Sequence, residues 1–221
     1  MKATRVAKTQ ESDLDVRPRE KQRRDEILTV AAKVIRANGI DNVTMEDIAR
    51  ALGVTRLVIY RRFPSKDALI EAIFDKVEQT LFCEPGTWNG MGDRIAEQLS
   101  RARTFEDGYV IFASDVTRNP KFAERLLAAR RRTAADLIDY LGLDPNAPAE
   151  HLALATESMV SYVHTALEWW IKHGSPDRDR LFLGYTSSTI LAWRKAACES
   201  LGLGDPAMFI PLSPRWFKPS S

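Results

Sequence analysis

Residues 44–63 read TMEDIARALGVTRLVIYRRF, and this stretch predicts two short helices joined by a tight turn. Thr44 is a hydroxyl residue of the type that caps a helix N-terminus, and two acidic residues follow it in the first turn. Gly53 suits the left-handed backbone of a turn. Thr55 is placed to cap a second helix, which is expected to end before Pro64.

The spacing of small and apolar residues identifies this pair of helices as a helix-turn-helix. Ala49 is small where the two helices must cross closely, and Gly53 follows it by four residues at the turn. Val54 and Ile59 are apolar where the unit must pack on a preceding helix. Residues 55–63 are therefore expected to form the recognition helix, which enters the major groove of DNA in such units. An ordinary helical hairpin is the alternative.

The recognition helix has a core side and an open side when its residues are placed at 100° intervals. Ile59 and Phe63 fall on the core side, with Leu57 and Arg61 opposite them. Arg56 lies in the first turn, where an arginine can contact guanine, and an aliphatic side chain can touch a thymine methyl group. The candidate base-contacting residues are Arg56, Leu57 and Val58, and the candidate phosphate-contacting residues are Thr44, Tyr60 and Lys66. Solvated side chains are the alternative.

The longer run over residues 44–69 resembles the DNA-binding domain of the tetracycline-repressor (TetR) family. The spacing Ile59-Tyr60-x-x-Phe63-x-x-Lys66 is particularly specific to that family, and the resemblance extends over residues 20–75. It implies a homodimeric, ligand-responsive transcriptional regulator, most often a repressor, with a three-helix head and an all-α body that dimerises through its last two long helices. By position it implies phosphate contacts for Thr44, Thr55, Tyr60 and Lys66, and groove-facing roles for Arg56, Leu57 and Arg61.

The recognition helix departs from the usual family pattern at four positions. Leu57 stands where a small residue or proline is common, and Val58 stands where a hydroxyl is common. Arg61 and Arg62 occupy positions that are often held by an aromatic residue or histidine. The resemblance therefore predicts DNA binding without predicting the base sequence of the operator.

The rest of the chain is expected to form further helices in two domains. A helix from Pro18 to Asn38 follows a disordered tail over residues 1–17, and Ser65 caps a fourth helix. Further helices are expected over residues 93–103, 105–118, 120–141, 149–173 and 177–201. No convincing alternating strand is present, so the expected fold is all-α. The predicted domains are a helix-turn-helix head over 18–65, a helical effector-binding and dimerisation body over 66–201, and a Pro-rich C-terminal tail over 202–221.

The 221-residue chain has 32 basic and 30 acidic side chains, and its small net charge of +2 is unevenly distributed. Residues 1–66 carry a net charge of +6 and residues 67–221 a net charge of −4, which predicts a polyanion-binding head on a body with another task. With no long apolar run and no signal-peptide core, a cytoplasmic protein without a membrane partner is expected. Cys83 and Cys198 cannot form a disulfide framework or a four-ligand zinc site.

The sequence does not support an enzyme, a metal site or a bound cofactor. The chain lacks a glycine-rich phosphate loop and a Ser/His/Asp or Cys/His arrangement. His164 and Glu168 are four residues apart but have no third ligand, so a metal site is not expected. Asp136 with Asp139, and the three arginines 130–132, are interpreted as solvated helix surface. A helical adaptor that kept the head but lost DNA binding is the remaining alternative.

The predicted body contains more aromatic residues than a plain core needs, and some of them are candidates for an effector pocket. The pocket is expected within residues 93–173, away from the head. Its candidate residues are Phe105, Tyr109, Phe112, Tyr162, His164 and Trp169, with Ser161 and Thr165 as further polar groups. Such a lining favours a small hydrophobic or aromatic effector. Core packing is the alternative for each residue.

A homodimer is expected through two helical stretches near the C-terminus. Residues 152–170 carry an apolar stripe at helical spacing, formed by Leu152, Ala155, Met159, Val163, Ala166 and Trp170. Residues 180–197 are rich in small side chains, which let helices approach closely in a two-fold interface. A dimer would present two recognition helices, so its double-stranded DNA operator should be palindromic. A core stripe inside a monomer is the alternative.

Overall fold

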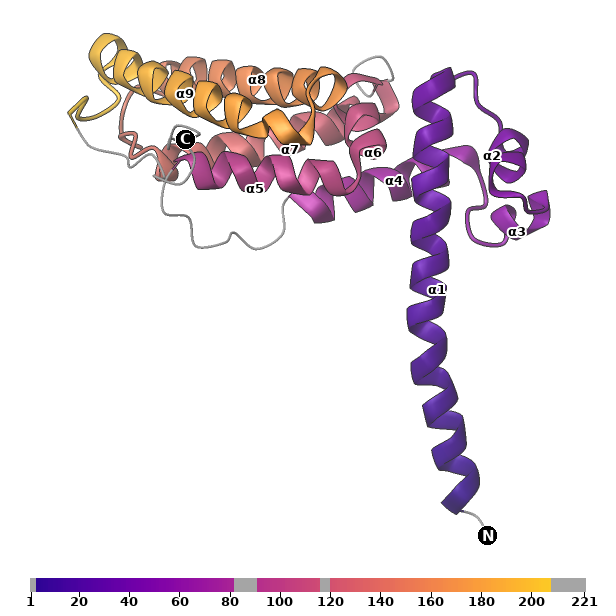
Figure 1. Cartoon of the computed structure of the whole chain (residues 1–221). Coiled ribbons are helices and arrows are strands. Elements are labelled where there is room, and N and C mark those ends of the chain that lie inside the picture. Colours follow the sequence, from indigo (N-terminus) through magenta and orange to yellow (C-terminus); the bar gives the residue numbers. More distant parts are fainter. Residues whose placement is uncertain (1–2, 82–90, 116–119, 208–221) are drawn as a thin grey trace. The chain divides into compact units, whose positions relative to one another are not determined.

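The computed structural model describes residues 3–81, 91–115 and 120–207, and within these ranges every regular element is a helix (Figure 1). These ranges contain no β-strand, so the all-α prediction is confirmed. The α-helices are α1 (Ala3–Asn38), α2 (Met45–Leu52), α3 (Arg56–Tyr60), α4 (Lys66–Leu81), α5 (Met91–Thr104), α6 (Glu106–Val110), α7 (Pro120–Tyr140), α8 (Ala149–His173) and α9 (Asp179–Leu201). A π-helical turn, η1 (Ile111–Asp115), follows α6, and a 3₁₀ turn, η3 (Pro176–Arg178), precedes α9.

Two compact units make up the chain, Met1–Lys76 and Val77–Ser221. The division falls within α4, whereas the sequence placed the boundary between head and body just before this helix. The head proper, with α1, α2 and α3, lies in the first unit, and α5 to α9 lie in the second.

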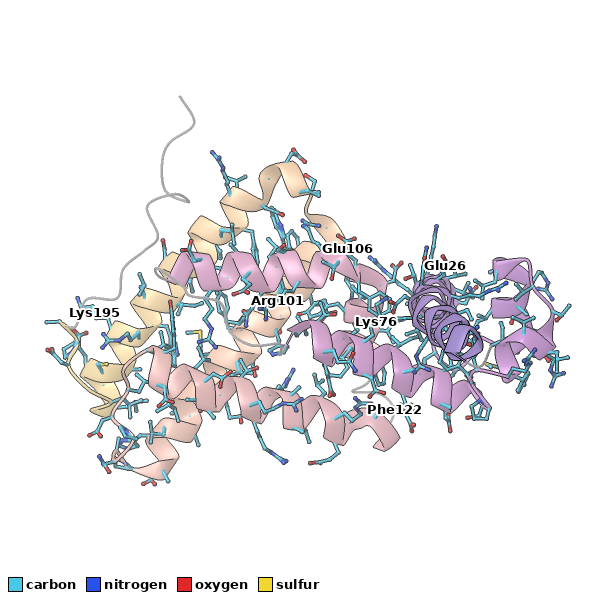
Figure 2. All side chains as sticks on the ribbon, turned by 90° about the horizontal axis from the view of Figure 1, so that it is seen from below. Glu26, Lys76, Arg101, Glu106, Phe122 and Lys195 are labelled. Atoms are coloured by element: carbon cyan, nitrogen blue, oxygen red, sulfur yellow. The ribbon has the colours of Figure 1, made fainter. Side chains whose placement is uncertain are left out.

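The first unit packs its helices around an apolar core. The core residues are Ile27, Leu28, Ala31, Ala32 and Ile35 from α1, Met45, Ile48 and Ala49 from α2, Ile59 from α3, Phe63 after it, and Leu69, Ile70, Ile73 and Phe74 from α4. Lys76 of α4, which Figure 2 labels, also forms an ion pair with Asp25 of α1 at 3.0 Å. Since a helix of five residues is not stable by itself, α3 depends on this packing, and each fully buried Ile or Phe contributes about 1.5–3 kcal/mol.

Helix α1 begins earlier than the sequence predicted. The backbone is helical from Ala3, where we expected a disordered tail to residue 17 and a helix start at Pro18. Residues 3–17 contain neither glycine nor proline and are rich in Ala, Arg, Lys, Gln and Glu, which have high helix propensity. Pro18 removes only its own backbone donor, and the helix continues through it.

In the second unit, α8 and α9 run side by side, α7 packs on α8, and α5 packs on α9 (Figure 1). Helix α8 has the bounds that the sequence predicted, 149–173. The helices expected over 93–103, 120–141 and 177–201 correspond to α5, α7 and α9. Each of these helices buries its apolar face in the core of the second unit.

The helix expected over residues 105–118 is instead two short elements, α6 and η1. Phe105 precedes α6 with a non-helical backbone, and its ring covers Gly108 so closely that a Cβ there would lie 2.2 Å from the Phe105 ring. The glycine thus lets the ring fold back on the helix, and the π-helical turn follows directly. Such turns are rare and are frequently found at functional sites.

The described part of the predicted C-terminal tail, residues 202–207, is held against the body. Gly202 ends α9 in the left-handed conformation (φ 69°), and Leu203 is fully buried. Arg194 is buried in α9 and donates to the carbonyls of Leu141 at 2.7 Å and Asp205 at 3.0 Å. The prolines Pro211, Pro214 and Pro219 lie outside the described residues.

Candidate functional site

The first helix of the predicted helix-turn-helix begins at a complete capping box. The Asp47 backbone N–H donates to Oγ1 of Thr44 at 3.2 Å, and the Thr44 N–H donates to Oδ2 of Asp47 at 3.1 Å. The Thr44 hydroxyl also donates to Oδ2 of Asp47 at 2.6 Å, and the two hydrogen bonds that the carboxylate accepts from Thr44, together with the nearby Arg50, lower the pKa of Asp47. Gly53 ends α2 at φ 65°, in the left-handed region, as the sequence predicted. The hydroxyl of Thr44 is therefore occupied within the head.

Helix α3 presents the faces that its sequence predicted. Ile59 and Phe63 are fully buried, whereas Leu57 is 69% exposed and Arg61 is exposed opposite them. Val58 and Tyr60 are half-buried on the flanks. An exposed leucine beside exposed arginines is unusual for a five-residue helix, and it suits a surface that meets another molecule.

Arg56 is held by two partners within the head. Its Nη1 lies 2.6 Å from Oε1 of Glu46 on α2, and its Nη2 donates to the Tyr60 hydroxyl at 3.3 Å. The guanidinium also stacks on the Tyr60 ring, 4.8 Å from the ring centre. Helical periodicity did not predict Glu46 as a partner, because Glu46 and Arg56 lie on different helices.

Arg61 and Thr55 have no such partners among the described side chains. No hydrogen bond or ion pair within the described ranges involves the Arg61 guanidinium. Thr55 has the extended backbone of an N-cap residue, but its side chain makes no capping hydrogen bond, contrary to the predicted cap. Both side chains are therefore available to a ligand on the open side of α3.

Lys66 is placed differently from the free phosphate donor that the sequence suggested. Its Nζ donates to the carbonyls of Ile40 at 3.0 Å and Asp41 at 3.3 Å. It thus ties the loop between α1 and α2 to the start of α4. The cap predicted for that helix is present, because the Ala68 N–H donates to Oγ of Ser65 at 3.1 Å.

The structure divides the predicted effector-pocket residues among three places. Phe105 and Phe112 are buried in the core and line no described cavity. Tyr162 and Trp169, together with Ser161 and Thr165, line an open groove of about 700 Å³ on α8 and α9, which we call the outer groove. Tyr109 and His164 line a small space of about 20 Å³, the inner cavity, with Leu81, Gln98, Thr133, Val163 and Leu167.

The outer groove is apolar and leaves large side chains open to solvent. Trp169 is 57% exposed, and Leu181 and Tyr185 on α9 are 66% and 69% exposed. Beneath them Trp170 stacks on Phe182 with ring centres 5.4 Å apart. A contiguous exposed apolar patch of this kind marks an interaction surface.

The apolar stripe predicted for the dimer interface is largely buried inside the body. Ala155, Met159 and Val163 are buried inside the body, and Leu152, Ala166 and Trp170 are half-buried. The expectation that this stripe faces a partner is therefore wrong for its central residues, because α7 and α5 cover that side of α8. The outward face of the pair comprises Trp169, Leu181, Tyr185, Ser188 and Ala192 instead.

The inner cavity is surrounded by ionisable groups. Burial, together with the positive charge of Arg130, lowers the pKa of His164 to about 4, against the opposing effect of Glu168. Burial also raises the pKa of Tyr109. Glu168 accepts hydrogen bonds from Ser114 and Lys172, each at 2.5 Å.

The described ranges contain no cluster of three or more His, Cys, Asp or Glu side chains that could hold a metal ion. They also contain no helix that is both long and apolar enough to span a membrane. Cys198 is buried with a free thiol, and Cys83 lies outside the described residues.

Helices α2 and α3, joined by the turn at Gly53, have the arrangement of a DNA-binding helix-turn-helix, and the described residues that follow them form further helices. Residues 27–73 match the family described as bacterial regulatory proteins, tetR family. This confirms the resemblance seen in the sequence.

The curated relatives of this chain match only part of it. The nucleoid occlusion factor SlmA of Aliivibrio fischeri (strain MJ11) is 36% identical over 66 residues, which is 29% of this chain and 34% of the relative. The SlmA of Vibrio cholerae serotype O1 is 31% identical over 99 residues, 44% of this chain and 47% of the relative. The chain thus spans between 29% and 47% of the length of these curated relatives.

One solved structure has the same fold over most of the chain. It is a tetR-family transcriptional regulator from Streptomyces coelicolor, with a TM-score of 0.54 and 19% identity, and the match covers 82% of this chain and 86% of that one. At this identity the likeness concerns the fold alone.

Proposed function

We propose that this protein is a DNA-binding transcriptional regulator that acts in the cytoplasm as a repressor and is released from a palindromic operator by a small effector. The observation that carries the proposal is the open face of α3, where Leu57 and Arg61 project on a helix that buried Ile59 and Phe63 hold in place. The family match over residues 27–73 supports the same reading.

Base recognition is assigned to the side chains that are exposed on α3. Arg61 is unpaired, so it can contact guanine without giving up another bond. Leu57 and Val58 suit thymine methyl groups, and Arg56 can reach a base only after it leaves Glu46. Thr55 and Tyr60 offer hydroxyl groups to phosphates.

Phosphate contact is a weaker assignment for Thr44 and Lys66, because both are engaged within the head. Thr44 is bonded to Asp47, and Lys66 to two carbonyls. We therefore propose that these two residues mainly hold the shape of the head, and that the exposed residues of α3 supply most of the contacts.

The body is proposed to form a homodimer through the outward face of α8 and α9. Trp169, Leu181 and Tyr185 expose apolar area there, and Ser188 and Ala192 extend the same face of α9 with small side chains. A second copy related by a two-fold axis would cover this face with the same residues. Two heads would then read two half-sites, which requires a palindromic operator.

The effector is proposed to bind in the second unit at the inner cavity, because a second copy would cover the outer groove in the proposed dimer. Leu81, Val163 and Leu167 give the cavity an apolar wall, which suits a largely hydrophobic molecule. Coupling to DNA binding must be reciprocal, so any loss of DNA affinity caused by the effector equals the loss of effector affinity caused by DNA.

Selection of binding sites from random duplex DNA tests this function. The full chain should enrich an inverted repeat, with an affinity that falls steeply with salt concentration. Arg61→Ala should lose about 1–3 kcal/mol of discrimination at one base position of each half-site. Arg180→Ala is the matched control, because it removes one exposed charge from the body. Failure to enrich any sequence at low salt would contradict the proposal and favour an adaptor without DNA binding.

A further inference from the structure

The interior of the body contains hydrogen-bond donors that have no acceptor. Tyr109 of α6 is 2% exposed, and its hydroxyl is buried without a hydrogen-bond partner. Nε of Arg130 on α7 is likewise buried and unpartnered. His164 of α8 makes no hydrogen bond within the described ranges. The side chains of Tyr109, Arg130 and His164 thus come from three helices, and each carries an N–H or O–H group that can donate a hydrogen bond.

Arg130 differs from the two arginines that follow it. Arg131 is paired with Glu124 at 3.2 Å, and Arg132 with Glu78 at 3.6 Å. Arg130 is half-buried and has no carboxylate partner among the described side chains. The interpretation of all three as solvated surface is therefore wrong for Arg130, which turns inward where α7 packs on α8.

The charged groups around the inner cavity include one more positive charge than is paired, which favours the binding of one anion. Thr133, one helical turn after Arg130 on α7, lines the inner cavity, which places Arg130 beside it. The positive charge of Arg130 also opposes the burial that raises the pKa of Tyr109, and it adds to the burial that lowers the pKa of His164. Glu168 is the acidic group that acts on the same two residues, but its Oε1 already accepts from Ser114 and Lys172. Because Lys172 pairs with Glu168, the charge of Arg130 is left uncompensated.

Burying these donors without an acceptor costs free energy of folding. A buried donor without an acceptor costs about 1–3 kcal/mol, and more when the group is charged. A carboxylate has two oxygens and about four lone-pair directions, so it can accept from a guanidinium, a phenol and an imidazole at once.

We propose that the effector carries a carboxylate, which Arg130, Tyr109 and His164 bind at the inner cavity, and a short apolar chain that packs on Leu81, Val163 and Leu167. This inference rests on the proposed ligand-responsive function and names the chemical class of its ligand. It adds a charged anchor to the hydrophobic effector that the aromatic residues alone suggested.

The size of the cavity makes binding depend on a conformational change. At about 20 Å³ it holds a single water molecule and no acid. The acid must bind a form in which α6, α7 and α8 have separated, and it shifts the population toward that form. The π-helical turn η1 directly follows α6 and is the irregular segment closest to Tyr109.

Calorimetric titration of the full chain without DNA tests the proposal. The probes are butanoate, hexanoate and octanoate, each compared with its primary amide, which keeps the shape and removes the charge. At least one acid should bind about tenfold or more tightly than its amide, because hydrogen bonds to a charged group are the stronger ones. Equal binding of acid and amide, or no binding of any acid, would overturn the proposal.

Two variants separate ligand binding from folding. Tyr109→Phe removes only the unpartnered hydroxyl, so the melting temperature should stay the same or rise while affinity for the acid falls several-fold. Arg130→Met should abolish the preference for the acid, whereas Arg131→Met, its exposed neighbour, should leave it unchanged. An unchanged acid preference in Tyr109→Phe and Arg130→Met would refute the site.

The same preparations should be tested for binding to the selected DNA. A chain that binds the acid but no DNA disproves the proposed function and leaves the site standing. A chain that binds DNA but shows no acid preference disproves the site alone.

Discussion

Nη1 of Arg56, the first residue of α3, lies 2.6 Å from Oε1 of Glu46 on α2. This pair joins the two helices of the helix-turn-helix on their solvent side, since both side chains are substantially exposed. An exposed ion pair contributes only about 0–1 kcal/mol. Arg56 is therefore held in a defined position and can still exchange Glu46 for DNA at small cost.

Glu46→Gln is expected to strengthen DNA binding. The substitution frees Arg56 and removes one negative charge from the surface proposed to meet phosphates. The gain should be about two- to fivefold at low salt and smaller at high salt, because the effect is electrostatic. A gel shift measures it, with Glu150→Gln in the body as control. Weaker binding would mean that Glu46 orients Arg56 for base contact.

Lys66→Met is expected to loosen the loop between α1 and α2. The ammonium group donates to the carbonyls of Ile40 and Asp41, and each hydrogen bond contributes about 0.5–1.5 kcal/mol. Amide hydrogen exchange of residues 39–43 should therefore become faster in the variant. Lys33→Met, which changes an exposed lysine of α1, should leave it unaltered. Unchanged exchange with a large loss of DNA affinity would restore Lys66 as a phosphate contact.

Asp179→Asn is expected to destabilise the second unit by about 2 kcal/mol. Asp179 accepts from Arg103 at 2.9 and 2.6 Å and from the Trp170 indole at 2.6 Å. Arg103 also pairs with Glu106, which Figure 2 labels. Loss of the carboxylate leaves a largely buried guanidinium only partly paired. Urea unfolding followed by tryptophan fluorescence reports on this unit, because all five tryptophans follow residue 77.

The control for this prediction is the exposed pair Lys195–Glu199 on α9 (Figure 2), whose groups are 3.7 Å apart. Glu199→Gln should change the free energy of unfolding by no more than about 0.5 kcal/mol. A comparable loss in both variants would show that the junction at Asp179 contributes no more than a surface pair.

His164→Gln is expected to make the second unit less sensitive to acid. The pKa of His164 is about 4 in the folded chain against an ordinary value of 6.5, so the unfolded chain binds the proton at higher pH. The stability that neutral His164 supports is complete above pH 6.5 and is lost as the pH falls toward 4. Between pH 7 and pH 5 the parent chain should lose about 2 kcal/mol more than the variant in urea unfolding. Parallel losses would refute this assignment.

Tyr185→Asp is expected to produce a monomer. Tyr185 lies at the centre of the proposed dimer face and is 69% exposed in the single chain, so the substitution costs little stability there. Facing its own copy across a two-fold axis, the carboxylate would be buried without a partner. Light scattering should show a dimer for the parent chain and a monomer for the variant, with Glu157→Gln as control. A parent chain that is already monomeric would exclude the dimer.

Local sequence patterns were enough to predict the fold class, the helix-turn-helix and the two faces of α3. A helix turns by a fixed angle per residue, so Ile59 and Phe63 could be assigned to the core and Leu57 and Arg61 to the surface before any packing was known. Caps and stops are equally local, which is why Thr44, Gly53 and the bounds of α8 agree with the structure.

Only the tertiary structure determined which polar groups meet and which side of a helix is covered. The apolar spacing of Ala155, Met159 and Val163 fits a core as well as a dimer interface, and the packing of α7 and α5 on α8 decides for the core. Arg130 looks like its neighbours in the sequence, yet it alone turns inward without an acceptor. Charge and periodicity describe one helix at a time, whereas hydrogen-bond partners come from helices that are distant in sequence, so the contacts of Arg130, Tyr109 and Lys66 arise only when the chain is folded.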